Sequence, residues 1–572
     1  MIYQGVLSRW TLSAHTKASS LGADIPVPIQ QALYRRGVLT AQDVHRYFHP
    51  DPTHLLPVDA LPDLDRALLI LHEALSRGSF IFVVGDYDVD GTTSAALIGS
   101  FFRAIGHTAF YLHLPDRFKE GYGISDYAVS LALEKNTALF IAVDCGTKEG
   151  ARLMRLKQAG MKVIVLDHHA MGEEDPFPPA DAFVNPQRPD SEYPNPHLSA
   201  GALTYRVLEA YRERYGRPET WEGIDLAAIS LLADIMPLVG ENRTLVQLGL
   251  AQLQKSPRPG ILALLETIAL PPHSLGRSRS IVFQLVPRLN APGRIHNPRS
   301  TLFLLLAEHY SDRLNQIAKY LDELNTYRQR LQQKAYQEAL DYLELRYPGI
   351  TSDVRLAPPA LVVANPKWNK GILGLVASNL MERFYRPVAV FTQTNDGWVG
   401  SARSPAEVPL YEVLRSWCAP HLKRFGGHSR AAGLILYPEK LEAFTKSFQK
   451  GCAAYGELIP TNVMDASISV LDLQASNLAN WVERFEPIGP QNEAPRFQLN
   501  GLYFWGEQEG RFHFGDGRVI YDARAEERGL ARLRAHLNQR KGQALSLVIT
   551  PRLSPSGRTH LRLRDVLLGN SD

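Results

Sequence analysis

The sequence predicts an α/β protein in which a long helix joins a parallel-sheet domain to a smaller α/β domain, followed by a C-terminal β-barrel. Three observations predict this order. Short apolar runs alternate with helical ones up to about residue 245, no Gly or Pro occurs between Ser311 and Tyr347, and short strand-like runs follow residue 456. Because 572 residues exceed what one hydrophobic core usually supports, several domains are expected.

We divide the chain into five segments on this basis. Residues 1–55 form an N-terminal segment with helical stretches that ends in the turn-rich residues 49–52. Residues 56–245 form the parallel-sheet domain, because runs of strand length alternate there with helices, as in βαβ units. The strands expected in this domain are 79–84, 138–143, 161–166 and 182–184.

The other segments are a helical connector at 246–350, a smaller α/β domain at 351–455 and a barrel at 456–572. The connector contains the long helix at 311–347, and the smaller domain has a helix at 372–384 between two strands. Five strands and a helix at 530–537 in the last segment fit a small barrel such as an OB-fold. The expected strands are 360–364 and 387–391 in the smaller domain, and 497–505, 511–514, 518–523, 545–550 and 560–566 in the barrel.

The composition is typical of a globular protein. Hydrophobic residues make up 45% of the chain, charged residues make up 21%, and the mean hydropathy is −0.17. The net charge is only +3, but residues 511–572 hold twelve Lys or Arg against six Asp or Glu. A basic surface is therefore expected at the C-terminal end of the chain.

The first twenty residues lack the continuous apolar core of a secretory signal, and no apolar run is long enough to span a bilayer. We therefore expect a cytoplasmic protein without membrane association. The three cysteines are too few and too scattered for a disulfide framework or a thiolate zinc site, so Asp, Glu or His must bind any metal. The cysteines are Cys145, Cys418 and Cys452.

The first chemical motif directly follows a predicted strand and contains Asp86, Asp88 and Asp90. Three carboxylates at alternate positions repel one another unless a cation binds them, so the motif favours a metal site. An EF-hand loop is disfavoured because its twelfth position would be Leu97 and a strand precedes it. A solvated acidic turn is the other alternative for this motif taken alone.

Two further strands end in acids or histidines. Asp144 follows the strand at 138–143, and residues 167–169, Asp-His-His, follow the strand at 161–166. The carboxyl ends of parallel strands lie at one edge of a sheet, so these residues are expected to meet the first motif there. Carboxylates beside two adjacent histidines favour a metal site over a buried core histidine.

Asp234 lies in a strongly apolar stretch, residues 226–237, which we interpret as a helix. An isolated acid there carries a large desolvation cost unless it is paired or bound to metal. Helix capping or a buried salt bridge is the alternative explanation for Asp234.

In order and spacing, four motifs resemble those of the DHH phosphoesterases: residues 85–91 (Gly-Asp-Tyr-Asp-Val-Asp-Gly), 143–146 (Val-Asp-Cys-Gly), 167–169 (Asp-His-His) and 233–234 (Ala-Asp). The resemblance extends to residues 287–294 (Pro-Arg-Leu-Asn-Ala-Pro-Gly-Arg), 401–403 (Ser-Ala-Arg) and 426–433 (Gly-Gly-His-Ser-Arg-Ala-Ala-Gly). With the barrel included it covers nearly the whole chain. The chain is most similar to the members of the family that degrade single-stranded DNA.

This resemblance implies an exonuclease that uses two Mn²⁺ or Mg²⁺ ions and releases mononucleotides from single-stranded DNA in the 5′ to 3′ direction. Its implied context is DNA repair and recombination. A helicase and a single-strand-binding protein are the protein partners that such an activity suggests, and we expect a monomer.

The resemblance also implies roles for the motif residues. Asp86 and Asp88 bind one ion, and Asp144 bridges both ions. The ligands of the other ion are Asp90, His168 and Asp234. His169 is implied to face the substrate phosphate, although a share in metal binding stays open, and Asp144, His168 and His169 are the implied catalytic residues. Related enzymes commonly have a histidine where this chain has Val84, so Asp86 is its expected substitute. The full set of implied ligands is Asp86, Asp88, Asp90, Asp144, His168 and Asp234.

The implied substrate contacts lie in the connector and the smaller domain. Arginine can bind phosphate oxygens with two hydrogen bonds, and serine or histidine can donate to the same oxygens. Two adjacent glycines let a DNA strand or a terminal phosphate approach the backbone, although they can also simply form a turn. These residues are Arg294, Ser401, Arg403, Gly426, Gly427 and His428.

Aromatic residues are interleaved along the predicted barrel strands beside basic residues. Such an arrangement is typical of proteins that bind single strands by base stacking. Alternate aromatic residues on a strand are also commonly core, so about half of them are expected to be buried. They are Tyr503, Phe504, Trp505, Phe512 and Phe514.

Two other functions stay open. A DHH phosphatase could act on short oligonucleotides, cyclic dinucleotides or pyrophosphate, but it would not need the additional N-terminal and C-terminal segments. A catalytically inactive relative could serve as a scaffold in replication, but it would be free to lose its acids, and here the only gap in the motifs is at Val84.

Overall fold

The computed structural model describes residues 2–13, 21–172, 174–216, 221–475, 477–525, 530–554 and 558–568. The chain forms two compact units. The first consists of Met1–Ala14, Thr326–Ala475 and Arg496–Asp572, and the second of His15–Asn325 and Ser476–Pro495. The division into five segments therefore remains a prediction.

The second unit is built on a five-stranded parallel sheet with the strand order β4-β3-β5-β6-β7. All four strands predicted for this domain are confirmed. Strand β4 was not predicted, because its sequence Phe-Tyr-Leu-His is only partly buried at the edge of the sheet. The strands are β3 (Ile81–Val84), β4 (Phe110–His113), β5 (Leu139–Val143), β6 (Lys162–Leu166) and β7 (Ala182–Val184).

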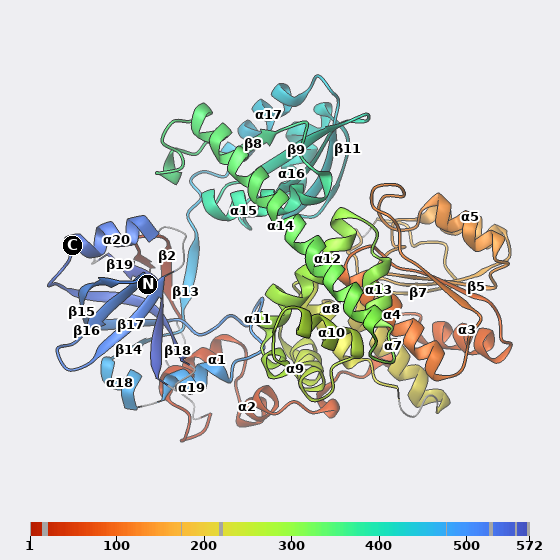
Figure 1. Cartoon of the computed structure of the whole chain (residues 1–572), viewed down its shortest axis with the longest axis horizontal. Helices are drawn as coiled ribbons and strands as arrows, with labels where there is room; N and C mark the ends of the chain where they lie inside the picture. The colour runs from red at the N-terminus through yellow and green to blue at the C-terminus, as the bar shows by residue number, and fades with distance from the viewer. Residues whose placement is uncertain are drawn as a thin grey trace. The chain divides into compact units, whose positions relative to one another are not determined.

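Helices cover both faces of this sheet, and Figure 1 shows α3 and α5 on opposite sides of β5 and β7. Alternate strand residues point to opposite faces, so Ile81 and Val83 pack in one core while Phe82 and Val84 pack in the other. Because both faces of the sheet are buried, the strands have continuous apolar sequences. The covering helices are α3 (Leu64–Ser76), α4 (Val89–Ala104), α7 (Ala200–Tyr215) and α8 (Ile224–Ala233) on the first face, and α5 (Asp126–Glu134) and α6 (Gly150–Gln158) on the second.

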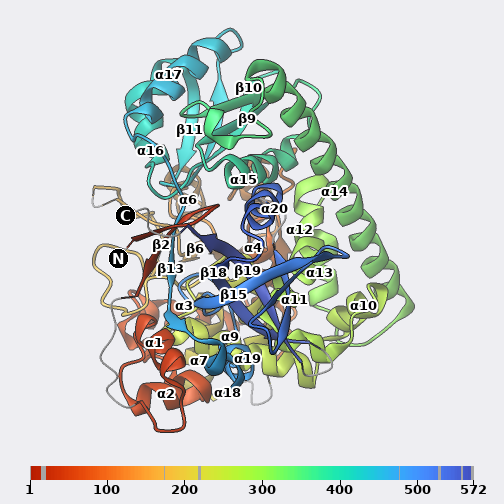
Figure 2. The same ribbon diagram turned by 90° about the vertical axis from the view of Figure 1, so that its left-hand side faces the viewer.

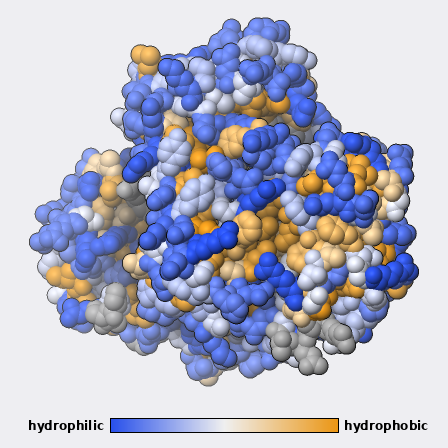
Figure 3. Space-filling view, turned by 45° about the vertical axis from the view of Figure 1, so that its right-hand side comes forward, coloured by the Kyte–Doolittle hydropathy of each residue, from blue (hydrophilic) through white to orange (hydrophobic). Residues whose placement is uncertain are grey.

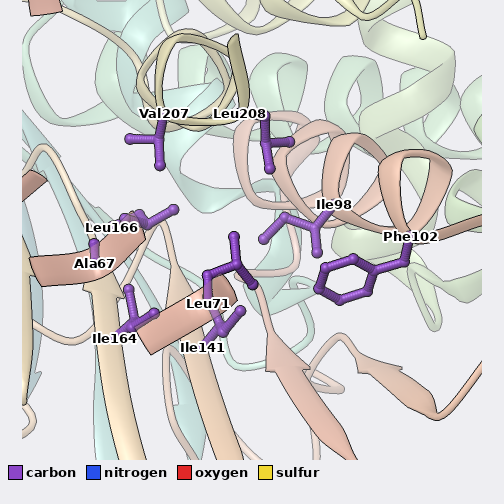
Figure 4. A pocket seen from close by; sticks show the side chains of 9 residues that line it. All are labelled: Ala67, Leu71, Ile98, Phe102, Ile141, Ile164, Leu166, Val207 and Leu208. Atoms are coloured by element: carbon purple, nitrogen blue, oxygen red, sulfur yellow. The ribbon is translucent and has the colours of Figure 1, made fainter. Parts of the chain in front are cut away.

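A small cavity of about 10 Å³ lies in the larger of these cores, between the sheet and α3, α4 and α7. Figure 4 shows that only apolar side chains point into it, among them Leu71, Ile141 and Val207. A space of this size without polar groups is a packing gap and offers no partner to water or to a ligand.

The connector is helical, and its long helix is confirmed as α14, Asp312–Arg346. Before it, α12 contains Pro292 and ends at Ile295, so the segment 287–294 lies on a helix. The other helices of this region are α9 (Gly240–Lys255), α10 (Pro259–Thr267), α12 (Val286–Ile295) and α13 (Arg299–Leu305).

In the first unit, the smaller domain has a five-stranded sheet with the order β11-β12-β10-β9-β8. The predicted strands β8 and β9 and the predicted helix α15 (Leu373–Phe384) are confirmed. Strands β8 and β9 are parallel, and the remaining pairs are antiparallel. The strands are β8 (Leu361–Ala364), β9 (Val388–Thr394), β10 (Gly397–Arg403), β11 (Leu422–Gly427) and β12 (Ala431–Leu436).

The predicted barrel is confirmed. Its strands follow the order β15-β16-β17-β19-β18, and pairing between β18 and β15 closes the ring. Helix α20 (Leu530–Gln539) lies between β17 and β18 in the chain, which completes the OB-fold topology, and Figure 2 shows it beside the strands. The strands are β15 (Phe497–Gln508), β16 (Arg511–Gly515), β17 (Ile520–Ala525), β18 (Ala544–Leu553) and β19 (Thr559–Leu567).

The N-terminal segment has the helical stretches that the sequence predicted, α1 (Val27–Arg35) and α2 (Ala41–Phe48), and also a hairpin that was not predicted. Strands β1 (Ile2–Gln4) and β2 (Arg9–Leu12) form a hairpin, and β2 pairs in parallel with β13 (Thr461–Met464). Asp565 of the barrel accepts hydrogen bonds from Leu7 N and Ser8 N at 3.0 Å and from Trp10 Nε1 at 2.8 Å. These contacts join segments that lie more than 550 residues apart in the sequence.

Among the residues that the structure describes, no helix is both long and apolar enough to cross a membrane. The face in Figure 3 is mostly hydrophilic, with separate hydrophobic areas between the polar residues. All three cysteines are buried as free thiols.

Arg243 of α9 is a buried cation that binds the backbone of two other segments of the second unit. Its guanidinium donates to the carbonyl oxygens of Tyr47, Phe485, Glu486 and Pro487. Only 3% of the residue is exposed, and it lies 3.7 Å above the ring of Tyr47. These bonds connect α9 with α2 (Ala41–Phe48) and with the segment after α19 (Leu478–Glu483).

We expect Arg243→Ala to destabilise the second unit, because four carbonyl oxygens each lose a hydrogen bond from a buried cation. The expected loss is about 3 kcal/mol, which lowers the thermal unfolding midpoint of this unit by roughly 6 to 12 °C. Arg77, whose side chain is 75% exposed, is the matched control, and Arg77→Ala should leave the midpoint within about 2 °C. Equal midpoints for the two variants would contradict this interpretation.

Candidate active site

The carboxyl ends of β3, β5 and β6 lie side by side, as the sequence predicted. The first motif follows β3, Asp144 follows β5, and His168 follows β6. Asp234 also lies here, but it is not inside a helix as we had expected. Helix α8 ends at Ala233, and Asp234 is the residue that caps it.

The structure brings the six predicted ligands together, with His168 beside three of the acids. Its Nε2 atom lies 3.3 Å from Asp144 Oδ1, 3.5 Å from Asp90 Oδ2 and 3.7 Å from Asp234 Oδ2. Three groups have ligand atoms within 4.8 Å of one another: Asp86 with Asp88 and Asp144, Asp90 with His168 and Asp234, and Asp144 with His168 and His169. Because Asp144 belongs to two of these groups, it lies between the other carboxylates.

Burial makes this cluster electrostatically unfavourable without a cation. Burial and the neighbouring Asp88 raise the pKa of Asp86 to about 8. Burial and the nearby charge of Asp90 likewise raise the pKa values of Asp88, Asp144 and Asp234. Oxygen ligands with one imidazole nitrogen suit Mn²⁺ or Mg²⁺, so the donor set fits the metal ions expected from the sequence.

Local structure fixes the first motif in place. Asp88 caps α4 by accepting from Asp90 N at 2.9 Å and from Gly91 N at 3.2 Å. Asp90 in turn accepts from Ala200 N and Gly201 N at the start of α7, both at 2.9 Å, and from the Ser230 hydroxyl. These bonds orient the carboxylates of both residues before any ligand binds.

Glycine is required inside the motif and in the helix that packs against it. A Cβ atom on Gly91 would collide with the backbone of Asp86, and one on Gly293 of α12 would collide with the carbonyl oxygen of Tyr87. Asn290 of the same helix accepts from Val89 N at 3.1 Å. Helix α12 thus packs directly on the first motif.

Arg294 also lies beside this motif, where its charge favours the ionised form of Asp88. Its role in binding substrate stays a prediction. Val84, the departure from the family pattern, is fully buried in β3 and packs in the core formed with α5 and α6. It contributes no ligand atom, and Asp86 is the acid that follows it.

Asp167 orients the histidines. Its carboxylate accepts from His169 Nδ1 at 2.7 Å, from His168 N at 2.8 Å and from Thr147 Oγ1 at 2.6 Å. Burial alone would lower the pKa of His169, but the Asp167 carboxylate outweighs it and raises that pKa to about 9. Sequence reasoning grouped Asp167 with the histidines but missed Thr147, for which the sequence gives no local signal.

The predicted substrate contacts of the smaller domain form a group of their own. Ser401 on β10 and Gly426 on β11 both lie opposite Gly433 of β12, so they share one row across three strands. Arg403 Nη1 donates to Ser401 Oγ at 3.0 Å. His428 follows directly after β11, and its N donates to Ala431 O at 2.8 Å.

The two glycines of this group differ in their structural role. Gly427 has φ +146°, and a Cβ atom there would collide with Ala431 O, so the hairpin requires glycine at this position. A Cβ atom on Gly426 would meet nothing within 4 Å. The alternative of a simple turn therefore accounts for Gly427 but gives no reason for Gly426.

The aromatic residues of the barrel divide as expected. Phe504, Phe512 and Phe514 are buried in the core, whereas Tyr503 is 41% exposed and Trp505 is 49% exposed. The two exposed rings come from the same strand, β15, and are the residues of this set that can meet a ligand.

Comparison with known proteins agrees with this architecture. Residues 80–233 match the N-terminal domain of the DHH family, and residues 357–454 match the DHHA1 domain. The chain is 34% identical over 448 residues to the single-stranded-DNA-specific exonuclease RecJ of Salmonella typhimurium, covering 76% of each chain. It is 32% identical to RecJ of Escherichia coli, covering 79% of this chain and 78% of that one.

Solved structures give the same result. RecJ of Thermus thermophilus in complex with Mn²⁺ matches with a TM-score of 0.77 and 26% identity, over 96% of this chain and 77% of that one. A manganese-bound exonuclease RecJ matches with a TM-score of 0.58 and 33% identity, over 70% of this chain and 95% of that one. The DHH resemblance is confirmed, and the chain belongs to the RecJ family of single-stranded-DNA-specific exonucleases.

Proposed function

We propose that the chain is a metal-dependent exonuclease that hydrolyses single-stranded DNA from its 5′ end and releases mononucleotides, in DNA repair and recombination. One observation carries the catalytic part of this proposal: carboxylate and imidazole groups from four separate segments form three overlapping groups at one sheet edge, and within each group the ligand atoms lie within 4.8 Å of one another. Family membership supplies the substrate class. The polarity is the one that the resemblance of the motifs implies.

Two sets of residues would hold the metal ions. Asp86 and Asp88 would hold one ion, Asp90, His168 and Asp234 the other, with Asp144 between the two. Two divalent ions in such a site supply a hydroxide near pH 7 and neutralise charge on the attacking and leaving oxygens.

The remaining polar residues bind and orient the DNA strand. His169, which Asp167 holds at Nδ1, faces the scissile phosphate. Arg294, beside Asp88, binds a phosphate oxygen. In the smaller domain, the row of Ser401 and Gly426 presents few side chains, so a phosphate or sugar can approach the backbone. Arg403, Gly427 and His428 complete the proposed substrate contacts.

The substrate determines the proposed partners and place of action. An enzyme that degrades only single strands needs a source of them, which a helicase provides, and a single-strand-binding protein covers the same DNA. We place the activity in the cytoplasm and the working form as a monomer. Co-purification with a helicase tests the proposed partner, and sedimentation of the purified chain tests the monomeric state.

Replacing Asp144 should abolish hydrolysis, because the residue lies between both sets of ligands. Asp144 has φ +59°, and asparagine tolerates this conformation better than alanine, so Asp144→Asn tests the charge with little strain. We expect nucleotide release to fall about 10³-fold or more, as it should in the wild type when a chelator removes the metal.

The assay compares 5′-labelled and 3′-labelled single strands and duplexes in Mn²⁺. Early release of the 5′ label from single strands alone is the expected pattern for the wild type. Asp59 is exposed in a short 3₁₀ helix, and Asp59→Asn should retain full activity. Metal-dependent release that persists in Asp144→Asn would refute the assigned site, and no release by the wild type would favour a scaffold.

The exposed aromatic residues of the barrel should matter for long strands only. Replacing Tyr503 and Trp505 together with alanine should raise KM for a strand of about 20 nucleotides roughly 10-fold or more, because stacking is lost. KM for dinucleotides and kcat should stay unchanged. Tyr455→Ala, which removes a ring that is 40% exposed outside the barrel, is the control. An equal rise in KM for dinucleotides would contradict a role in holding long strands.

A further inference from the structure

The loop between β4 and α5, residues 114–125, reaches the candidate metal centre in three places. Gly123 N donates to Asp86 Oδ1 at 3.4 Å, and the guanidinium of Arg117 lies 5.1 Å above the ring of Tyr87. The third contact is made by Tyr122, whose hydroxyl lies 3.0 Å from His169 Nε2. None of the loop residues belonged to the site expected from the sequence.

The carboxylate of Glu120 holds the loop in this position. Glu120 accepts from Ser125 Oγ at 2.6 Å and from Asp116 N at 3.0 Å, and its carboxylate lies 2.9 Å from His113 Nε2. Gly121 and Gly123, on either side of Tyr122, have φ values of +92° and +70°. A side chain would strain the backbone at both positions, so the sequence Gly-Tyr-Gly permits the turn that presents Tyr122.

The contact with Tyr122 completes the bonding of the His169 imidazole. Asp167 holds Nδ1 at 2.7 Å, and Thr147 holds Asp167 through bonds of 2.6 Å and 3.0 Å. In the neutral ring, Nδ1 carries the proton and Nε2 accepts from the Tyr122 hydroxyl, whereas in the protonated ring Nε2 donates to the Tyr122 oxygen. Both ring nitrogens are engaged, so rotation of the imidazole breaks a hydrogen bond on either side.

Tyr122 is not needed as a core residue. The residue is 49% exposed, so its hydroxyl could bond to water without any contact to His169. A tyrosine that merely filled space would not need its hydroxyl directed at this nitrogen. The rings of Tyr122 and His169 also meet edge to face at 6.1 Å, which restricts how the imidazole can move.

We propose that Tyr122 is a positioning residue that holds His169 in the orientation required by the scissile phosphate. This inference rests on the proposed exonuclease function, because it assigns a role to His169 in that reaction. A phosphate oxygen that approaches the edge of the imidazole then meets a ring already turned toward it, and the cost of ordering the ring is met during folding.

Tyr122→Phe tests the proposal, because it removes the hydroxyl and keeps the ring. We expect kcat for Mn²⁺-dependent release from single-stranded DNA to fall roughly 3- to 10-fold, the worth of one hydrogen bond, with KM within about 2-fold of the wild type. Tyr127, on the neighbouring helix α5, is 54% exposed, and Tyr127→Phe is the matched control with unchanged kcat.

A double-mutant cycle separates action through His169 from any other effect of Tyr122. In the His169→Ala background, measured at high enzyme concentration, Tyr122→Phe should cause no further loss of kcat. A second loss of the same size as in the wild type would overturn the proposal, because Tyr122 would then act independently of His169.

The imidazole ¹⁵N resonances of the metal-free protein give a readout that does not depend on activity. The spectrum of His169→Ala assigns the His169 signals, which should shift or broaden in Tyr122→Phe and stay unchanged in Tyr127→Phe. Unchanged His169 signals, or unchanged kcat in Tyr122→Phe while the wild type is active, would overturn the proposal and leave the proposed function intact. If the wild type released no nucleotides, the proposed function itself would fail.

Discussion

Repulsion among buried carboxylates is the constraint on which the rest of this structure depends. Asp86, Asp88, Asp144 and Asp234 have raised pKa values because burial and like charges disfavour their ionised forms. A protein gains nothing in stability from such a cluster, so it indicates a cation-binding function. The parallel sheet creates the cluster by placing three strand ends at one edge, and the donors at the start of α7 hold Asp90 there.

Hydrogen bonds from neighbouring residues hold the acids and His169 in fixed orientations. Several groups at the centre are held by residues that are not among the predicted ligands. Asn290 fixes the backbone of the first motif, Asp167 and Thr147 fix His169, and Ser230 fixes Asp90. Such supporting bonds keep ligands in place when charge changes during a reaction. The proposed substrate-binding residues of the smaller domain differ, because there the sheet exposes a row that is poor in side chains.

Much of this could be predicted from sequence where the signal is local. Apolar runs predicted β3, β5, β6 and β7. The acids that follow β3, β5 and β6 predicted the site, because the parallel topology alone brings these strand ends together. Asp234 was placed inside a helix because the apolar run continues past Ala233, although the helix ends there. The pairing of β2 with β13 and the contact of Tyr122 with His169 depend on partners distant in sequence, which no local pattern encodes.

The most direct test of the central claim is anomalous diffraction from crystals of the chain grown with Mn²⁺. The account predicts two manganese peaks roughly 3.5 to 4 Å apart, both next to Asp144, with His168 and Asp234 around one of them. A single ion, or ions bound away from Asp144, would contradict it.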